Sequence, residues 1–389
     1  MKNPMPRHSH IFLALIAMFF AADSDAAIDW AFEDTMQEIV DQINEGSGQA
    51  FSDALDVDAL MGRVFQDVEI GEVTKAGFSR DIQRSKKQIG DNMVRKIADG
   101  YYAILLNVDQ NDDEAVALVR YDTGDLRFGY HAYELKKDDA GNVRIVDWLD
   151  YLDGAKYSEA LRLSVVAFEP TAASVRSLVP GFQGSDEDYA KFADVISAYS
   201  KKEYQKFYDV SVTLPRPIRQ TRFMQMLTCI VSRMTRDRNL YNEAYRELAK
   251  NFGNDPRVAM TLIPYFFERR DADKAMETQR ALQESLGIRD GALLAFMART
   301  ALAVRNADEA SILADEAIST EPTLEAAYWA AIDAHVLLNH YSFAVMTVKS
   351  LESQFEKSIE HERFEGNSMY GEFVKSSHYQ QWQTEKQQR

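Results

Sequence analysis

The sequence predicts two folds in one chain: an α+β N-terminal domain, with helices on a curved four-stranded antiparallel sheet, followed by an all-α helical solenoid. Three observations predict this order. Apolar residues recur at helical spacing over residues 28–100, the period changes to that of strands over 101–151, and a pattern of about 34 residues repeats in the C-terminal half. Helices followed by short strands with polar turns are typical of an α+β domain.

Residues 1–26 are predicted to be a secretory signal peptide. Lys2 and Arg7 give a basic start, and the apolar run at 11–20 is too short to cross a bilayer as a helix. Ser24 and Ala26 place small side chains at the −3 and −1 positions of a cleavage site. We therefore expect an exported protein, periplasmic or alternatively extracellular, with no membrane insertion after signal cleavage. The alternative is an uncleaved N-terminal anchor.

The composition excludes some partners. Hydrophobic residues make up 46% of the chain, which is enough for packed cores, and the formal net charge is −17. Such an acidic surface repels phosphate backbones, so no nucleic-acid partner is expected. The single cysteine, Cys229, stands in an apolar run and is expected to be a buried hydrophobe. The sequence has no phosphate-cradling glycine loop, nucleophile elbow or paired cysteines, so we expect no cofactor and no metal site.

Three helices are expected ahead of the strands. The first begins near Trp30 and ends at Gly46-Ser47-Gly48. The second is predicted over the apolar run at 51–68, and the third covers about 75–98.

Four strands follow, at 101–108, 115–121, 127–135 and 143–151, separated by polar turn clusters. The order of elements over 30–168, with the closing strand Val143-Arg-Ile-Val-Asp-Trp-Leu-Asp-Tyr151, resembles the nuclear-transport-factor-two-like superfamily, also called cystatin-like. The resemblance implies a cone-shaped domain, here placed at residues 27–168. Its pocket serves enzymes in some members of the superfamily, and only binding or dimerisation in others.

Five side chains are candidates for lining such a pocket. His131 and Asp147 lie on adjacent expected strands and would form an acid/base couple if they faced one cavity. Arg120, Tyr130 and Tyr133 are the other three. The alternative is that all five are cross-strand neighbours that fill a core. Because strand register cannot be read from the sequence, both interpretations stay open, and no residue is assigned a catalytic role.

A helical repeat is expected over residues 186–358, after a linker at 169–185. The run Arg305-Asn-Ala-Asp-Glu-Ala310 echoes Arg270-Asp-Ala-Asp-Lys-Ala275 thirty-five residues earlier, and Asn339-His-Tyr-Ser-Phe-Ala344 follows thirty-four residues later. A period near 34 is that of a stacked helix–turn–helix unit. The pattern is clear from about residue 225 and degenerate before it.

The segment 291–324 resembles a tetratricopeptide repeat residue by residue. Ala298 takes the small position of its first helix, Ala310 takes that of the second, and Pro322 stands where the family places its helix-ending proline. The resemblance implies a solenoid of antiparallel helix pairs. Residues 359–389 are expected to be a C-terminal capping helix or polar tail.

The resemblance to tetratricopeptide repeats also implies binding rather than catalysis. Candidates for a peptide groove on the repeats are Arg299, Arg305, Asn306, Tyr328, Trp329 and Tyr341, and the alternative is that they pack between units. We expect a non-enzymatic scaffold or adaptor that binds a protein or peptide partner through its repeats. The alternative function is a small-ligand-binding protein or enzyme that uses the pocket of the N-terminal domain. The sequence leaves the oligomeric state open.

Overall fold

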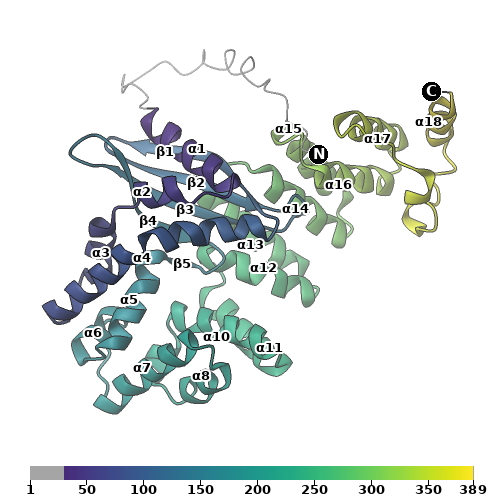
Figure 1. Cartoon of the computed structure of the whole chain (residues 1–389). Helices are drawn as coiled ribbons and strands as arrows, with labels where there is room; N and C mark the ends of the chain where they lie inside the picture. Colours follow the sequence, from purple (N-terminus) through teal and green to yellow (C-terminus); the bar gives the residue numbers. More distant parts are fainter. Residues whose placement is uncertain (1–29, 389) are drawn as a thin grey trace, which may run out of the picture.

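The computed structural model describes residues 30–388. The predicted signal peptide, residues 1–26, lies outside the described residues. The fold class is the expected one, because an α+β region with an antiparallel sheet is followed by a long all-helical region (Figure 1).

In the part of the chain that the structure describes, four helices precede the sheet. They are α1 (Ala31–Asn44), α2 (Gln49–Ala54), α3 (Val57–Phe65) and α4 (Glu72–Ala98). The run at 51–68 forms two helices because the backbone is extended at Leu55, and the amide of Asp56 donates to the carbonyl of Ile145 at 2.9 Å. The Asp56 side chain then caps α3 by accepting from the amide of Ala59 at 2.9 Å.

Within residues 30–388 the sheet has five strands rather than the expected four, in the order β1-β2-β3-β4-β5, and neighbours are antiparallel. The strands are β1 (Tyr102–Asn111), β2 (Glu114–Asp122), β3 (Phe128–Lys137), β4 (Val143–Asp150) and β5 (Ala155–Lys156). The sequence pattern did not show β5, because two residues are too few to alternate. Gly154, at φ +64°, turns the chain into β5, and a Cβ there would lie 2.7 Å from the carbonyl oxygen of Arg257.

Two helices lead from the sheet to the all-helical region. They are α5 (Tyr157–Phe168) and α6 (Ala172–Leu178), so the segment predicted as a linker, 169–185, contains a helix. Thr171 begins α6 by accepting from the amide of Ser174.

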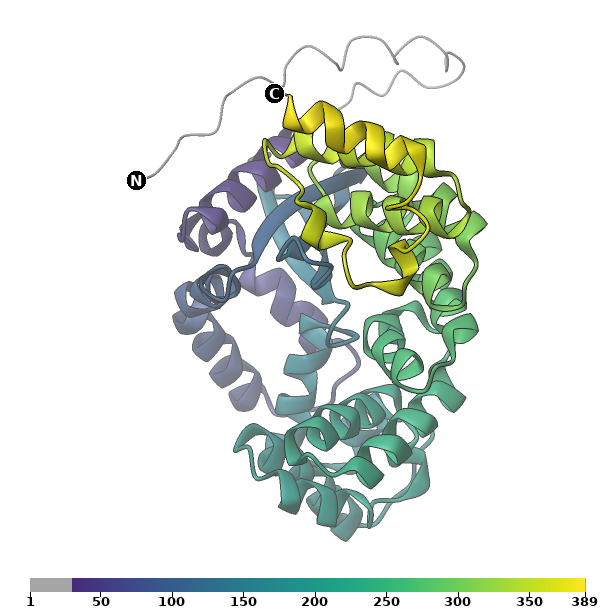
Figure 2. The same cartoon turned by 90° about the vertical axis from the view of Figure 1, so that its right-hand side faces the viewer.

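Five helical hairpins within the described residues form what we call the helical array. The pairs are α7 (Asp186–Ser200) with α8 (Tyr204–Ser211), α10 (Arg222–Thr235) with α11 (Arg238–Phe252), α12 (Ala259–Glu268) with α13 (Ala272–Leu286), α14 (Gly291–Ala303) with α15 (Ala307–Thr320), and α16 (Glu325–Leu337) with α17 (Tyr341–Gln354). The short helix α9 (Arg216–Arg219) joins the first two pairs, and a 3-10 turn, η1 (Pro256–Val258), precedes α12. Figure 2 shows the hairpins following one another from teal to yellow-green beside the α+β region.

One backbone conformation recurs at the turn of every hairpin in the array. Lys202, Arg236, Arg270, Arg305 and Asn339 have φ between +56° and +61°, and they are separated by 34, 34, 35 and 34 residues. A left-handed residue at the end of the first helix lets the chain reverse into the second. The repeat seen in the sequence is therefore a repeated backbone turn, and it extends back to α7 and α8, where the sequence pattern is degenerate.

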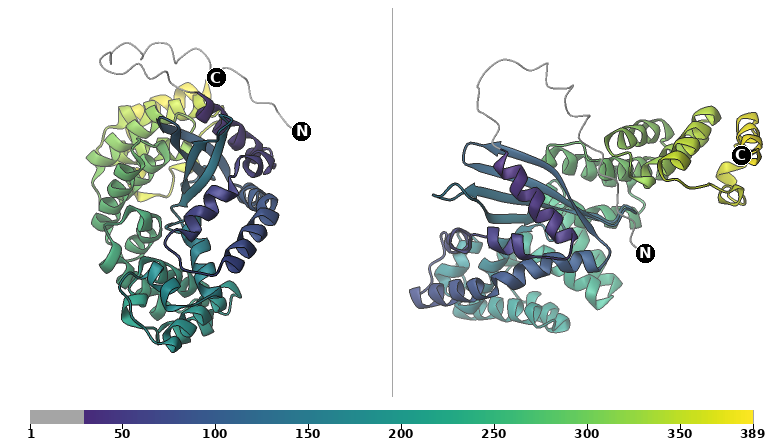
Figure 3. Two further views of the ribbon diagram at one scale, coloured as in Figure 1. Left: turned by 90° about the vertical axis from the view of Figure 1, so that its left-hand side faces the viewer. Right: turned by 45° about the horizontal axis from the view of Figure 1, so that its top comes forward.

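Helices cover both faces of the sheet. On one face, β2 and β3 contribute Val119, Tyr121 and Tyr133 to a core shared with α1–α4, and Figure 3 shows α1 lying across this face. On the other face, the apolar side chains of Leu118 and Phe128 pack with α12 to α16 of the array. The sheet is therefore the middle layer between its own helices and the array.

The chain after α17 contains a buried aromatic cluster. It forms two 3-10 turns, η2 (His361–Arg363) and η3 (Ser368–Tyr370), and then α18 (Ser377–Gln387). Phe364 is 1% exposed, and the rings of four aromatic side chains surround it at centroid distances of 5.1–6.1 Å: Tyr370, Phe373, Tyr379 and Trp382. We call residues 359–387 the C-terminal segment. It closes the end of the array with aromatic packing that the polar sequence of the tail did not indicate.

Candidate functional site

Arg120, a predicted pocket residue, lies in the contact between the sheet and the array. Its side chain is fully buried, and its guanidinium donates to Asp290 Oδ1 and, at 2.7 and 2.9 Å, to the two carboxylate oxygens of Glu321. Its Nε lies 3.0 Å from Oδ2 of Asp122. Tyr130, opposite Arg120 on β3, donates from its hydroxyl to Asp290 Oδ2 at 2.7 Å. We call these five residues the interface node.

Arg120, at the centre of the interface node, stays positively charged although it is buried. Burial disfavours the charged guanidinium, but Asp290 and Glu321 together raise the pKa of Arg120 above its ordinary value. Asp290 also caps α14, since its Oδ2 accepts from the amide of Leu293 at 3.0 Å. Arg120 and Tyr130 therefore both join the sheet to the array through Asp290.

His131 and Tyr133 point to the opposite face of the sheet, into the core under α1–α4. Nε2 of His131 lies 2.7 Å from the ammonium of Lys96 and 3.0 Å from Oδ2 of Asp150, and Nδ1 lies 2.9 Å from the Tyr133 hydroxyl. That hydroxyl is 2.9 Å from the hydroxyl of Tyr121. We call these five residues the histidine network.

The surroundings shift the pKa values of groups in the histidine network. Burial lowers the pKa of His131, against the opposing effect of Asp150. Burial works against ionisation of Asp150, but His131 and Lys96 hold the pKa of that carboxyl below its ordinary value. Burial also raises the pKa of Tyr121 to about 12. The network thus runs from the half-buried Lys96 to a buried tyrosine pair.

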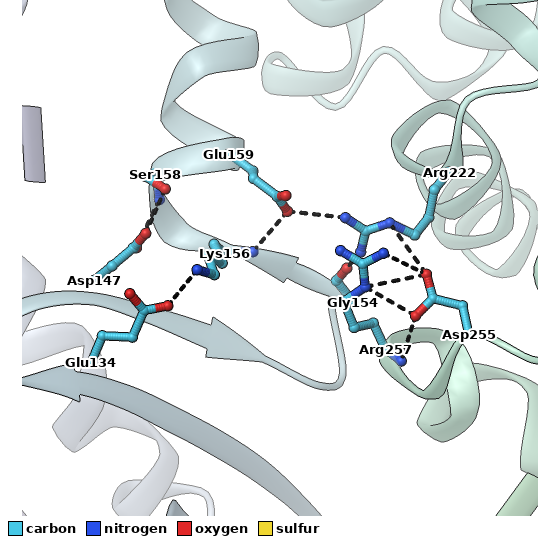
Figure 4. A network of polar contacts seen from close by, with 9 residues as sticks. All are labelled: Glu134, Asp147, Gly154, Lys156, Ser158, Glu159, Arg222, Asp255 and Arg257. Carbon is cyan, nitrogen blue, oxygen red and sulfur yellow. Dashed lines mark hydrogen bonds and ion pairs between the residues drawn. The ribbon is translucent and has the colours of Figure 1, made fainter. Parts of the chain in front are cut away.

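Asp147, the predicted partner of His131, has other contacts. The β3–β4 register pairs Asp147 with Glu134 and pairs His131 with Asp150. The Asp147 carboxylate accepts from the hydroxyl and the amide of Ser158, at 2.5 and 3.1 Å (Figure 4). Burial raises the pKa of Asp147. The structure therefore brings His131 together with Asp150, three residues further along β4.

A second polar contact joins the β4–β5 turn and α5 to the array (Figure 4). Arg222 on α10 donates to the carbonyl of Gly154 and, at 3.1 Å, to Glu159. Its Nε lies 3.8 Å from Asp255, which also pairs with Arg257 at 2.7 Å. Arg222 thus fixes the array to the α+β region at a place separate from the interface node.

The predicted groove residues of the repeats lie in different surroundings. Arg299 and Arg305 are exposed, whereas Asn306 caps α15 by accepting from the amide of Glu309 at 3.3 Å. The aromatic residues Tyr328, Trp329 and Tyr341 belong to the core that α16 and α17 share with the C-terminal segment.

The C-terminal segment contacts two of those aromatic residues directly. The guanidinium of Arg363 lies 4.4 Å from the ring centroid of Trp329, and the ring of Phe373 lies 5.9 Å from that of Tyr341. The hydroxyl of Tyr370 donates to Asp333 on α16. The chain itself therefore covers the aromatic part of the predicted groove.

A further groove, which the sequence reasoning missed, lies between α10, α11 and α12. Its volume is about 470 Å³. Its lining residues include Arg233, Arg236 and Arg238, together with Tyr241 and Tyr245. We call it the arginine groove. A sequence signal for it exists, because three arginines stand within residues 233–238 of an acidic chain.

Comparison with known proteins does not assign the chain to a family. No family model matches the sequence, and no curated protein matches it. Across residues 30–388, no helix has the length and apolar character needed to cross a membrane. In the same residues, no three or more His, Cys, Asp and Glu side chains are grouped so that they could hold a metal ion.

Proposed function

We propose that this chain is an exported, non-enzymatic binding protein that holds a protein or peptide partner on its helical array. In this proposal the array is a tetratricopeptide-type solenoid, and the α+β region is a nuclear-transport-factor-two-like domain that braces it. The proposed location is the periplasm, with the extracellular space as the alternative. The recurrence of the left-handed turn every 34 or 35 residues supports the first assignment, because stacked units of that length form extended binding surfaces.

The observation that carries the proposal is the arginine groove. It offers a concave volume of about 470 Å³ on the array. Two residues expected to line a pocket in the α+β region, Arg120 and Tyr130, are instead occupied in the interface node. Together, these two observations favour a partner bound on the array over a ligand bound in a pocket of the α+β region.

Site-specific photo-crosslinking in the producing cell tests this function. A photoreactive amino acid in place of Tyr241 lies in the arginine groove, and one in place of Val116, a 44% exposed residue of β2, is the control. We expect irradiation to give one defined protein adduct from position 241 and none from position 116. Equal adducts from both positions, or none from 241 in cells that make the full chain, would contradict the proposal.

The histidine network favours a second candidate, a small-ligand-binding protein or enzyme that uses the α+β region. A lysine side-chain nitrogen 2.7 Å from an imidazole nitrogen is an arrangement that can transfer protons. A thermal-shift screen of small metabolites with the full chain and its Lys96→Met variant tests this candidate. A compound that raises the melting temperature of the full chain, but not of the variant, would support it over the array function.

A further inference from the structure

We propose that the arginine groove binds an acidic segment of the partner protein, an inference that rests on the proposed function. Arg233 belongs to the end of α10, Arg236 is the left-handed turn residue, and Arg238 is the first residue of α11. The hairpin turn therefore brings three arginine residues to the lining of one groove. A guanidinium matches a carboxylate in shape and binds it through two parallel hydrogen bonds.

Arg233, Arg236 and Arg238 have no ion-pair partner within 4.0 Å among residues 30–388. The groove at the end of the array gives the contrast. There Lys349 pairs with Glu385 at 2.7 Å, Lys357 pairs with Glu325, and Lys386 pairs with Glu352 at 3.7 Å. That groove is neutralised from within, whereas the arginine groove presents cations that an external group can neutralise.

The two carboxylates that line the arginine groove are already engaged. Asp237 caps α11 by accepting from the amides of Asn239 and Leu240 at 2.8 and 3.1 Å. Glu268 lies beside the phenol of Tyr241, whose pKa is raised by burial and by neighbours that include Glu268. Neither carboxylate forms an ion pair with the arginines within 4.0 Å.

Two features favour a protein segment over a nucleic acid. Screening at physiological salt limits charge effects to about 8 Å, so the three arginines dominate locally although the chain carries a net charge of −17. A long polyanion would extend from the groove across the acidic surface, whereas a short acidic segment would end within it.

Fluorescence anisotropy with the full mature chain tests the inference. The probe is a labelled nine-residue peptide of Glu and Gly, and the comparison probe replaces each Glu with Gln. The test variant carries R233Q, R236Q and R238Q. The control variant carries R80Q, R84Q and K87Q on α4, which removes the same charge from exposed positions outside the groove.

We expect the Glu peptide to bind the natural chain and the control variant equally, and the groove variant about tenfold or more weakly. We also expect the affinity to fall as salt rises. Equal binding by the groove variant, equal binding of the Gln peptide, or displacement of the Glu peptide by low-millimolar inorganic phosphate would overturn the inference. If position 241 still crosslinks a partner while no acidic peptide binds, the partner chemistry is wrong and the proposed function stands.

Discussion

At the scale of single residues, Arg120 shows how strand alternation decides what a side chain can do. Arg120 and Tyr130 are directly opposite in the β2–β3 register, so they share a face. His131 is the next residue along β3 and therefore faces the other way. The sequence identified all three as chemically unusual, but their faces could not be predicted because a shift of one residue in register exchanges them.

Replacing Arg120 with Met should strongly destabilise the protein. The variant leaves Asp290 and Asp122 buried at the interface without their cation, and removal of one partner from a buried pair costs about 3–5 kcal/mol. Urea unfolding measures the change in the free energy of unfolding. Arg280→Met is the control, because Arg280 pairs with Glu309 at the surface, where an ion pair contributes about 1 kcal/mol or less. A similar decrease in the free energy of unfolding in both variants would show that the buried ion pairs of the interface node stabilise the protein no more than a surface pair does.

His131 should make stability depend on pH. Its pKa in the folded chain is lowered by burial, below the value of about 6.5 in an unfolded chain. Above about pH 6.5 its contribution is complete; as the pH falls below that value, the unfolded state binds a proton that the folded state resists, so stability decreases. The free energy of unfolding, measured at about pH 7.5 and 5.5, should therefore fall more in the natural chain than in His131→Gln. Equal falls would contradict this assignment. Buried carboxyls with a raised pKa, such as Asp147, act in the opposite direction in both proteins.

At the scale of elements, the repeats were the most predictable part of the molecule. Small residues at recurring positions such as Ala298 and Ala310, both fully buried, let the helices approach closely, and this requirement leaves a visible period in the sequence. The arginine groove left a weaker signal, since three arginines in a turn are also compatible with a solvated surface. The aromatic cluster around Phe364 was not foreseen because its residues are spaced irregularly through polar sequence.

The left-handed turns predict a stabilising substitution. Arg305 has φ +61°, a conformation that costs a non-glycine residue on the order of 1 kcal/mol or more and costs glycine little. We expect Arg305→Gly to raise the free energy of unfolding by about 0.5–1 kcal/mol, after the greater freedom of glycine in the unfolded chain is subtracted. Ala303→Gly, two residues earlier at the end of α14, should lower it by about 0.5–1 kcal/mol. Thermal or urea unfolding measures both variants. A lower free energy of unfolding in both would exclude backbone strain at the turn.

At the scale of the whole molecule, the sheet contributes to the cores of both regions. The same strands supply apolar side chains to the core under α1–α4 and to the core with the array. We therefore expect β2, β3 and α14 to unfold together. Hydrogen exchange should give their slowest amides the same opening free energy, and Arg120→Met should lower it in all three. Retention of full protection in β2 and β3 while α14 loses it would show that the regions unfold independently.

The long separation of the interface node along the chain has a consequence for the order in which the protein is made. Asp290 and Glu321 follow Arg120 by 170 and 201 residues. At a synthesis rate of about 5–20 residues per second, the strand that carries Arg120 is complete roughly 10–40 s before the helices that cover it. During that interval Leu118 and Phe128 have no array to cover them. The sequence of the chain therefore places the strand and the helices that cover it at widely separated points of synthesis, and the apolar face of the sheet has no cover until the later helices have been made.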